Sequence, residues 1–198
     1  MMCAVAYTHL RFLYWKKQYF YRNKLEFTFS SLRWLDEEDK QKQEAGEKIV
    51  TDGLGFHIPG KFDKVLDIQK CYLQADPAND IRLSIKQFAM EHQIPFFNVR
   101  LHEGVLRNLV IRTSSTGELM VIVVMTELND KTRSLLQFVA ERFPEITSLL
   151  YCINTKFNDL FFFRTEIDTA SAGNKNFILR IVEKHFCSSI AVGSIFYT

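Results

Sequence analysis

The stretch YFYRNKLEFTFS (19–30) alternates between apolar and polar positions, which is typical of a half-buried β-strand. The odd positions share one face, which is apolar except at Asn23, whose buried amide would need partners there. The even positions share the other face and place Arg22 and Lys24 on it, about 6–7 Å apart. The pattern therefore predicts a strand with one core face and one partly basic face.

Two further pairs of apolar runs predict β-hairpins. In the first, GLGFHIP (53–59) and KVLDI (64–68) are joined around the turn PGKFD. In the second, LVI (109–111) and LMVIVVM (119–125) flank the turn-rich stretch TSSTG, where Gly117 can supply a positive φ.

Two segments have the apolar spacing of amphipathic helices. The first begins at Asp76-Pro77, as N-cap and first helical residue, and runs to His92. The second spans residues 130–143 and ends before Pro144. We expect their core-facing stripes to contain Ile81, Ile85, Phe88 and Ala89 in the first helix and Leu135, Leu136, Val139 and Phe143 in the second.

The order of elements predicts an α/β (α+β) fold, in which a mixed, largely antiparallel sheet is layered with two main helices. Four more strands are expected, over residues 146–153, 160–167, 177–182 and 189–196. The charged run 36–52 has few apolar anchors and is interpreted as a solvated excursion between strands. Residues 1–18 form an atypical N-terminal segment before a domain that spans residues 19–198.

Composition is that of a soluble globular protein, with 47% hydrophobic and 24% charged residues in a chain of 198. The net charge of +2 creates no global attraction to nucleic acid, so polyanion binding would require a local basic patch. Cys3, Cys71, Cys152 and Cys187 form no CxxC pair and indicate free thiols. Because no signal peptide or apolar run of about 18 residues is found, we expect a cytoplasmic protein with no membrane partner.

The sequence lacks the common motifs of catalysis and cofactor binding. GxGxxG, GxxxxGK[ST], GxSxG and HExxH are all absent, and no Cys/His cluster has metal-binding spacing. These absences argue against the nucleotide-binding and hydrolase classes that those motifs mark.

Basic residues gather near the second hairpin, where Arg100, Arg107, Asn108 and Arg112 lie close in sequence. If this hairpin neighbours strand 19–30, they share one surface with Arg22 and Lys24. Guanidinium groups suit phosphate contact, and Tyr19, Phe20 or Tyr21 could stack on an unpaired RNA base. The alternative is that these cations are surface charges paired with Glu26, Glu103 and Glu118.

Four stretches carry a resemblance to a known family: YFYRNKLEFTFSSLRWL (19–35), GFHIPGKFDKVLDIQKCYLQ (55–74), HEGVLRNLVIRTSSTGELMVIVV (102–124) and ITSLLYCINTKFND (146–159). In this order they resemble the bacterial RNA (uracil-5) methyltransferases, particularly the 23S ribosomal RNA 5-methyluridine enzymes of Bacteroides-like organisms. The final VGSIFYT is similar to a shortened form of the family's Ser-Phe-Tyr-Gln-Thr-Asn segment.

The resemblance implies a three-part protein with an oligonucleotide-binding barrel, a central α/β domain and a Rossmann-like domain that binds S-adenosylmethionine. In the family, a cysteine attacks C6 of the flipped uracil, so that C5 accepts the methyl group. This chain matches the central domain, and it lacks the family's Asp-Pro-Pro-Arg and Ser-Cys-Asn-Pro motifs and its glycine-rich loop. We therefore expect no S-adenosylmethionine site in this chain, whose Rossmann-like domain is absent. Cys71 matches one of four iron–sulphur ligand positions, and the other three ligands are absent.

The resemblance also assigns candidate site residues. The family's substrate-contacting Arg-Asn-Arg/Lys element corresponds to Arg22-Asn23-Lys24, and Phe196 corresponds to a phenylalanine that packs against RNA bases. Arg107 and Arg112 are secondary candidates for RNA contact.

Taken together, these features predict the ribosomal RNA-recognition domain of an RNA uracil-5 methyltransferase, present as a fragment that is inactive alone. The open alternatives are a stand-alone RNA-binding module, the product of a truncated reading frame, and a protein-interaction domain. The last of these would self-associate through its apolar C-terminal strand.

Overall fold

Eight strands form one sheet in the computed structural model, which describes residues 18–155, 165–166 and 178–181. The strands are β1 (Lys24–Ser30), β2 (Gly53–Ile58), β3 (Lys61–Asp67), β4 (Leu106–Thr113), β5 (Leu119–Met125), β6 (Ser148–Ile153), β7 (Thr165–Glu166) and β8 (Ile178–Ile181). Their order across the sheet is β3-β2-β1-β4-β5-β6-β8-β7. The β5–β6 and β6–β8 pairs are parallel, and the other five pairs are antiparallel.

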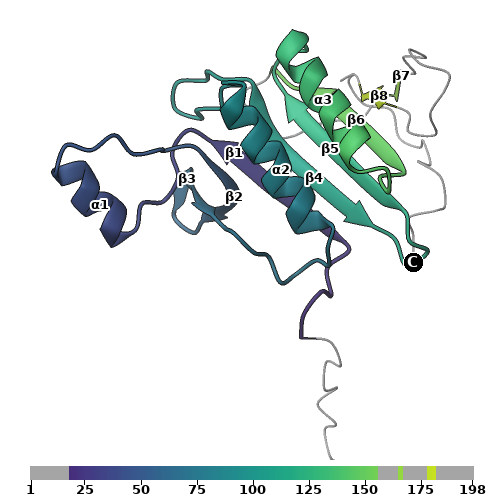
Figure 1. Cartoon of the computed structure of the whole chain (residues 1–198), viewed down its shortest axis with the longest axis horizontal. Coiled ribbons are helices and arrows are strands. Elements are labelled where there is room, and N and C mark those ends of the chain that lie inside the picture. The colour runs from purple at the N-terminus through teal and green to yellow at the C-terminus, as the bar shows by residue number, and fades with distance from the viewer. Residues whose placement is uncertain (1–17, 156–164, 167–177, 182–198) are drawn as a thin grey trace, which may run out of the picture.

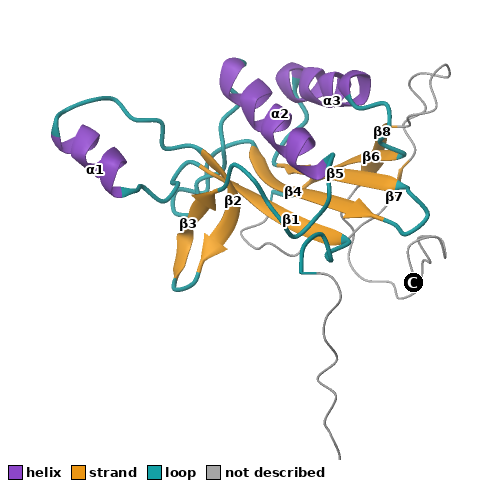
Figure 2. Cartoon of the chain, turned by 60° about the horizontal axis from the view of Figure 1, so that its bottom comes forward, coloured by secondary structure: helices purple, strands orange, loops and turns teal. Residues whose placement is uncertain are grey.

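Two helices, α2 (Ala78–Glu91) and α3 (Asp130–Arg142), cover one face of this sheet (Figures 1 and 2). A third helix, α1 (Glu37–Glu44), lies away from the sheet and buries none of its residues (Figure 1). The mixed, largely antiparallel sheet with two main helices is thus confirmed. The sequence did not predict α1, whose first turn is capped by the Asp36 side chain, which accepts a hydrogen bond from the Asp39 N–H at 2.8 Å.

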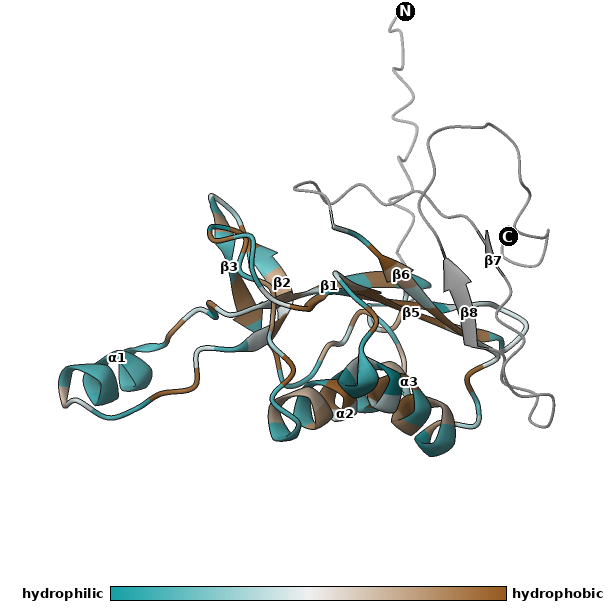
Figure 3. Cartoon of the chain, turned by 90° about the horizontal axis from the view of Figure 1, so that it is seen from above, coloured by the Kyte–Doolittle hydropathy of each residue, from teal (hydrophilic) through white to brown (hydrophobic). Residues whose placement is uncertain are grey.

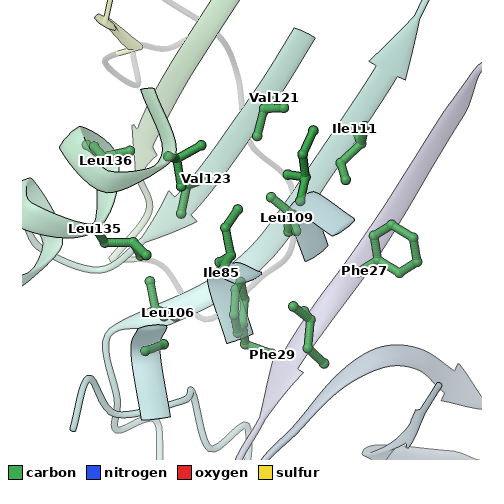
Figure 4. Close-up of a cluster of buried hydrophobic side chains, with 14 of the residues drawn as sticks. Phe27, Phe29, Ile85, Leu106, Leu109, Ile111, Val121, Val123, Leu135 and Leu136 are labelled. Carbon is green, nitrogen blue, oxygen red and sulfur yellow. The ribbon is translucent and has the colours of Figure 1, made fainter. Parts of the chain in front are cut away.

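The core lies between the sheet and the helices α2 and α3. Both expected helical stripes are buried there, together with alternate residues of the central strands (Figure 4). Hydrophobic residues dominate the central strands, whereas α1 is hydrophilic throughout (Figure 3). Among the described residues, no helix combines the length and hydropathy that a membrane crossing would need.

Strand β1 is shorter than the alternation predicted, because it begins at Lys24 and not at residue 19. Leu25, Phe27 and Phe29 point into the core, as expected from the pattern. Asn23 is exposed, and the preceding residues leave the sheet. Their backbone pairs with residues 72 and 73 instead, and this long-range pairing overrides the local alternation.

Both hairpins form where they were expected, with details set by their turns. β2 and β3 are joined tightly through Pro59 and Gly60, and the register shifts after His57. In the β4–β5 hairpin, Gly117 has a φ of 96°, which is the positive value that its turn requires.

The expected start of the first long helix is wrong by one residue. Pro77 is the N-cap of α2 and makes no side-chain capping bond. The Asp76 carboxylate instead accepts a hydrogen bond from Asn79 Nδ2 at 2.9 Å, inside the first turn. Of the late strands, β7 and β8 fall within the expected ranges, and the segments 1–17 and 189–196 lie outside the described residues.

Candidate nucleic-acid interface

Strands β1 and β4 are neighbours, which brings two expected cations together. Their antiparallel register pairs Lys24 directly with Arg112 and Thr28 with Asn108. Directly paired residues share a face of the sheet, with Cβ atoms about 5 Å apart. Because Leu25 and Phe27 point into the core beneath α2, Lys24 and Arg112 lie on the opposite face.

The segment 19–24 lies beside the segment 70–74, which connects β3 to α2. The Phe20 N–H donates to the Tyr72 carbonyl at 2.8 Å, and the Arg22 N–H donates to the Leu73 carbonyl at 2.9 Å. Asn23 joins this arrangement through its backbone, because its carbonyl accepts from the Thr113 N–H at 2.8 Å. The start of β1, the end of β4 and the segment 70–74 therefore meet at one edge of the domain.

Aromatic rings and cations are exposed together at this edge. The Tyr19 and Tyr72 side chains are 56% and 52% exposed, and their ring centroids lie 5.8 Å apart. Lys70 Nζ lies 5.2 Å from the Tyr72 ring centroid, and Arg22 Cζ lies 5.8 Å from that of Tyr21.

The side chains of Arg22, Lys24 and Lys70 are exposed and make no hydrogen bond or ion pair within the described ranges. This property separates Arg22 and Lys24 from the other cations of the expected cluster, and it leaves them and Lys70 available to an anionic ligand.

Arg107 is placed differently from the expectation. It is only 3% exposed, its Nη1 donates to the Asn154 carbonyl at 3.2 Å, and its guanidinium lies 4.4 Å from the Phe97 ring centroid. It also lies about 17 Å from Arg112 along β4. Arg107 therefore belongs to the interior at the far end of the strand and does not share the exposed edge.

Arg100 also lies away from this edge, in the loop that precedes β4. Its Nε donates to Asp63 Oδ2 at 2.7 Å, and its guanidinium lies 5.3 Å from the Phe62 ring centroid. The bond from Arg100 holds the pKa of the Asp63 carboxyl below its usual range. Asp63 was not among the carboxylates expected to pair with these arginines.

The Arg100–Asp63 pair gives a prediction for the pH dependence of stability. Because the Asp63 pKa is depressed in the folded state, the stabilisation is present above the unfolded pKa of about 3.9 and is lost as the pH falls through the folded value. We expect Arg100→Leu to lower the urea midpoint at pH 6, and we expect this difference from the unmodified chain to shrink progressively as the pH falls below about 4. A difference that is equal at every pH would contradict this assignment, and an Asp63→Asn background should abolish the difference.

The described residues do not fit an iron–sulphur cluster. Cys71 is buried, and its backbone is held by Asn79, whose Oδ1 accepts from the Cys71 N–H at 2.8 Å and whose Nδ2 donates to the Cys71 carbonyl at 3.1 Å. Within the described part of the chain, no three His, Cys, Asp or Glu side chains gather as metal ligands. A single thiolate cannot hold a cluster alone. Phe196, the remaining expected site residue, lies outside the described residues.

Lys70 and Tyr72 are the residues of this edge that the sequence did not indicate. They lie in a segment without periodicity, and only the pairing with residues 20–22 brings them to Tyr19 and Arg22. Their one sequence signal is the interleaving of a cation and an aromatic residue in QKCYLQ.

Comparison with known proteins identifies relatives of one functional class. The chain is 54% identical over 147 residues to an uncharacterized RNA methyltransferase of Bacteroides thetaiotaomicron and 56% identical over 144 residues to one of Porphyromonas gingivalis. These matches cover 72% and 71% of this chain but only 32% and 31% of the relatives. No protein-family model matches the chain.

A solved structure has a related fold. The Pyrococcus abyssi tRNA (uracil-54, C5)-methyltransferase, in complex with S-adenosyl-L-homocysteine, superposes with a TM-score of 0.51 at 19% identity. The match covers 85% of this chain and 36% of that one. The chain therefore spans about one third of the length of the bacterial RNA methyltransferases that it matches, and it shares the fold of a comparable part of the solved structure.

Proposed function

We propose that this chain is the substrate-recognition domain of an S-adenosylmethionine-dependent RNA uracil-5 methyltransferase, and that its ligand is ribosomal RNA. The observation that carries the proposal is the cationic edge where the exposed Arg22 and Lys24 lie next to the half-buried Arg112, which is paired with Lys24 across β1 and β4. The relatives that match the chain are RNA methyltransferases, which supports RNA as the ligand of this edge.

The cations at this edge can attract an RNA strand locally, although the net charge of the whole chain is too small to do so. The net charge is only +2, so binding depends on cations that are concentrated in one place. Arg22 can make two parallel hydrogen bonds to one phosphate, and Lys24 acts as a compact point charge. The arrangement can therefore fix the register of an RNA strand without reading its sequence.

Methyl transfer is assigned to other parts of the family's architecture. S-adenosylmethionine supplies the methyl group there, and the sequence of this chain has neither the Ser-Cys-Asn-Pro nucleophile motif nor the glycine-rich loop. The role of the described residues is to hold and orient the RNA. We expect the 198-residue chain to transfer no methyl group from S-adenosylmethionine to RNA.

The proposal is tested by an anisotropy titration of the chain with a uridine-containing ribosomal RNA hairpin at low and moderate salt. In the variant Arg22→Ala/Lys24→Ala, we expect weaker binding and a slope of log K against log salt that is smaller by about one to two. The reason is that each lost phosphate contact removes about one released counterion.

A matched control removes the same charges from the other side of the sheet. Lys131→Ala/Arg133→Ala deletes one lysine and one arginine that are exposed on α3, and it should leave the slope unchanged. Equal losses in both variants would mean that only net charge matters. Salt-insensitive self-association without RNA binding would instead support a protein-interaction domain.

A further inference from the structure

Tyr19 and Tyr72 form an exposed aromatic pair that takes no part in the phosphate contacts proposed for Arg22 and Lys24. Their rings are inclined by 59° with centroids 5.8 Å apart, and each is more than half exposed. Phe20, 37% exposed, adds a third ring 6.4 Å from Tyr19. Large aromatic side chains that share a surface in this way offer apolar faces to a flat ligand.

The backbone around Tyr72 is held by hydrogen bonds from three residues, namely Phe20, Asn79 and Arg82. The Phe20 N–H donates to the Tyr72 carbonyl, and Asn79 bonds both backbone groups of Cys71. Arg82 donates to the carbonyls of Ile68 at 2.5 Å and Gln69 at 3.0 Å. Because these bonds fix the backbone on each side of Tyr72, a ligand would meet a largely preformed surface.

Cations flank the rings and identify the kind of ligand. Lys70 Nζ lies 5.2 Å from the Tyr72 ring, and Arg22 lies two residues after Phe20 on the paired segment. Neither side chain makes an ion pair in the described part of the chain. Stacking faces beside unneutralised cations match a base with its flanking phosphate, which is the pattern of single-strand binding surfaces.

We propose that Tyr72 stacks on an unpaired base of the bound RNA and that the inclined Tyr19 ring contacts the edge of that base, with Lys70 contacting the phosphate beside it. The aromatic–basic surface, defined by Tyr19, Tyr72, Lys70 and Arg22, thus selects single-stranded or looped RNA over a continuous duplex. This inference rests on the proposed function, because it takes RNA as the ligand, and it adds the structural class that the edge prefers.

The test uses the full chain, a short uridine-rich single strand that carries 2-aminopurine, and a duplex of equal length. Tyr72→Ala should weaken single-strand binding about fivefold or more and abolish the change in 2-aminopurine fluorescence, with the salt slope unchanged. Tyr72→Phe, which keeps the ring, should restore both readouts. Lys70→Ala should reduce the salt slope by about one.

Duplex binding should change less than twofold in Tyr72→Ala. Phe62→Ala, which removes an aromatic side chain that is 64% exposed on β3, serves as the control and should change nothing. If the unmodified chain binds no RNA, this inference and the proposed function are both overturned. If binding depends on Arg22 and Lys24 but not on Tyr72, or if the duplex loses as much as the single strand, only the stacking inference is overturned.

Discussion

Arg82→Met is expected to lower the free energy of unfolding by about 2–4 kcal/mol, because it removes a buried donor from acceptors that stay behind. Arg82 is fully buried on α2, and its guanidinium donates to the carbonyls of Ile68 and Gln69. It also lies 5.3 Å from the Phe27 ring centroid. Methionine can fill much of the same space but cannot replace any of these bonds.

The opposing effect is the cost of burying the charge itself. Burial removes the Arg82 cation from water, which costs free energy and lowers the pKa of Arg82 below its ordinary value. Replacing a whole buried ion pair with apolar residues can be neutral or even stabilising. Here, however, the shortest bonds go to the backbone carbonyls of Ile68 and Gln69, which no substitution removes, so the loss of their donor dominates.

Urea unfolding followed by circular dichroism measures this effect. Arg133→Met, at an exposed position of α3, is the matched control and should change the stability by no more than about 0.5 kcal/mol. Arg82→Lys should recover only part of the loss, since an ammonium cannot span carbonyls that two guanidinium nitrogens reach. A stability equal to that of the unmodified chain would mean that water satisfies these carbonyls.

The position of Arg82 shows which part of the α2 packing can be predicted from the spacing of apolar residues. Ile81, Ile85, Phe88 and Ala89 define the buried stripe of α2, and Arg82 lies three residues before Ile85 on the same face. Spacing alone places it in the core, whereas residue type suggests the surface. Spacing prevails because the loop that follows β3 supplies the carbonyl acceptors of Ile68 and Gln69, and a local sequence pattern does not contain such long-range contacts.

The candidate interface was predictable only in part, for a similar reason. The alternation of residues 19–30 predicted that Arg22 and Lys24 share a polar strand face, although Arg22 lies before β1 and not within it. Arg107 was expected at the surface, but β4 is central in the sheet and buries both faces at that end. Lys70 and Tyr72 required knowledge of which backbone segments pair across about 50 residues of sequence, which single-sequence patterns do not contain.

Strand β1 connects the core to the cationic edge, so we expect truncation of its buried side chains to cause a large loss of stability. Phe29 is fully buried, and its ring meets that of Phe96 edge-on with centroids 5.0 Å apart. Phe29→Ala removes this contact and leaves a cavity between the sheet and α2, at an expected cost of about 3–5 kcal/mol. That is a large share of the 5–15 kcal/mol typical of a domain, so we expect a much lower urea midpoint.

The control for this change is a phenylalanine of opposite burial. Phe62→Ala removes the same atoms from a side chain that is 64% exposed, and it should cost less than about 1 kcal/mol. If Phe29→Ala unfolds the chain completely, Phe29→Leu provides a milder change that should remain folded with a reduced midpoint. RNA affinity measured well below the midpoint should remain intact in Phe29→Leu, because Arg22 and Lys24 are unchanged. Similar losses of stability for Phe29→Ala and Phe62→Ala would contradict the placement of β1 in the core.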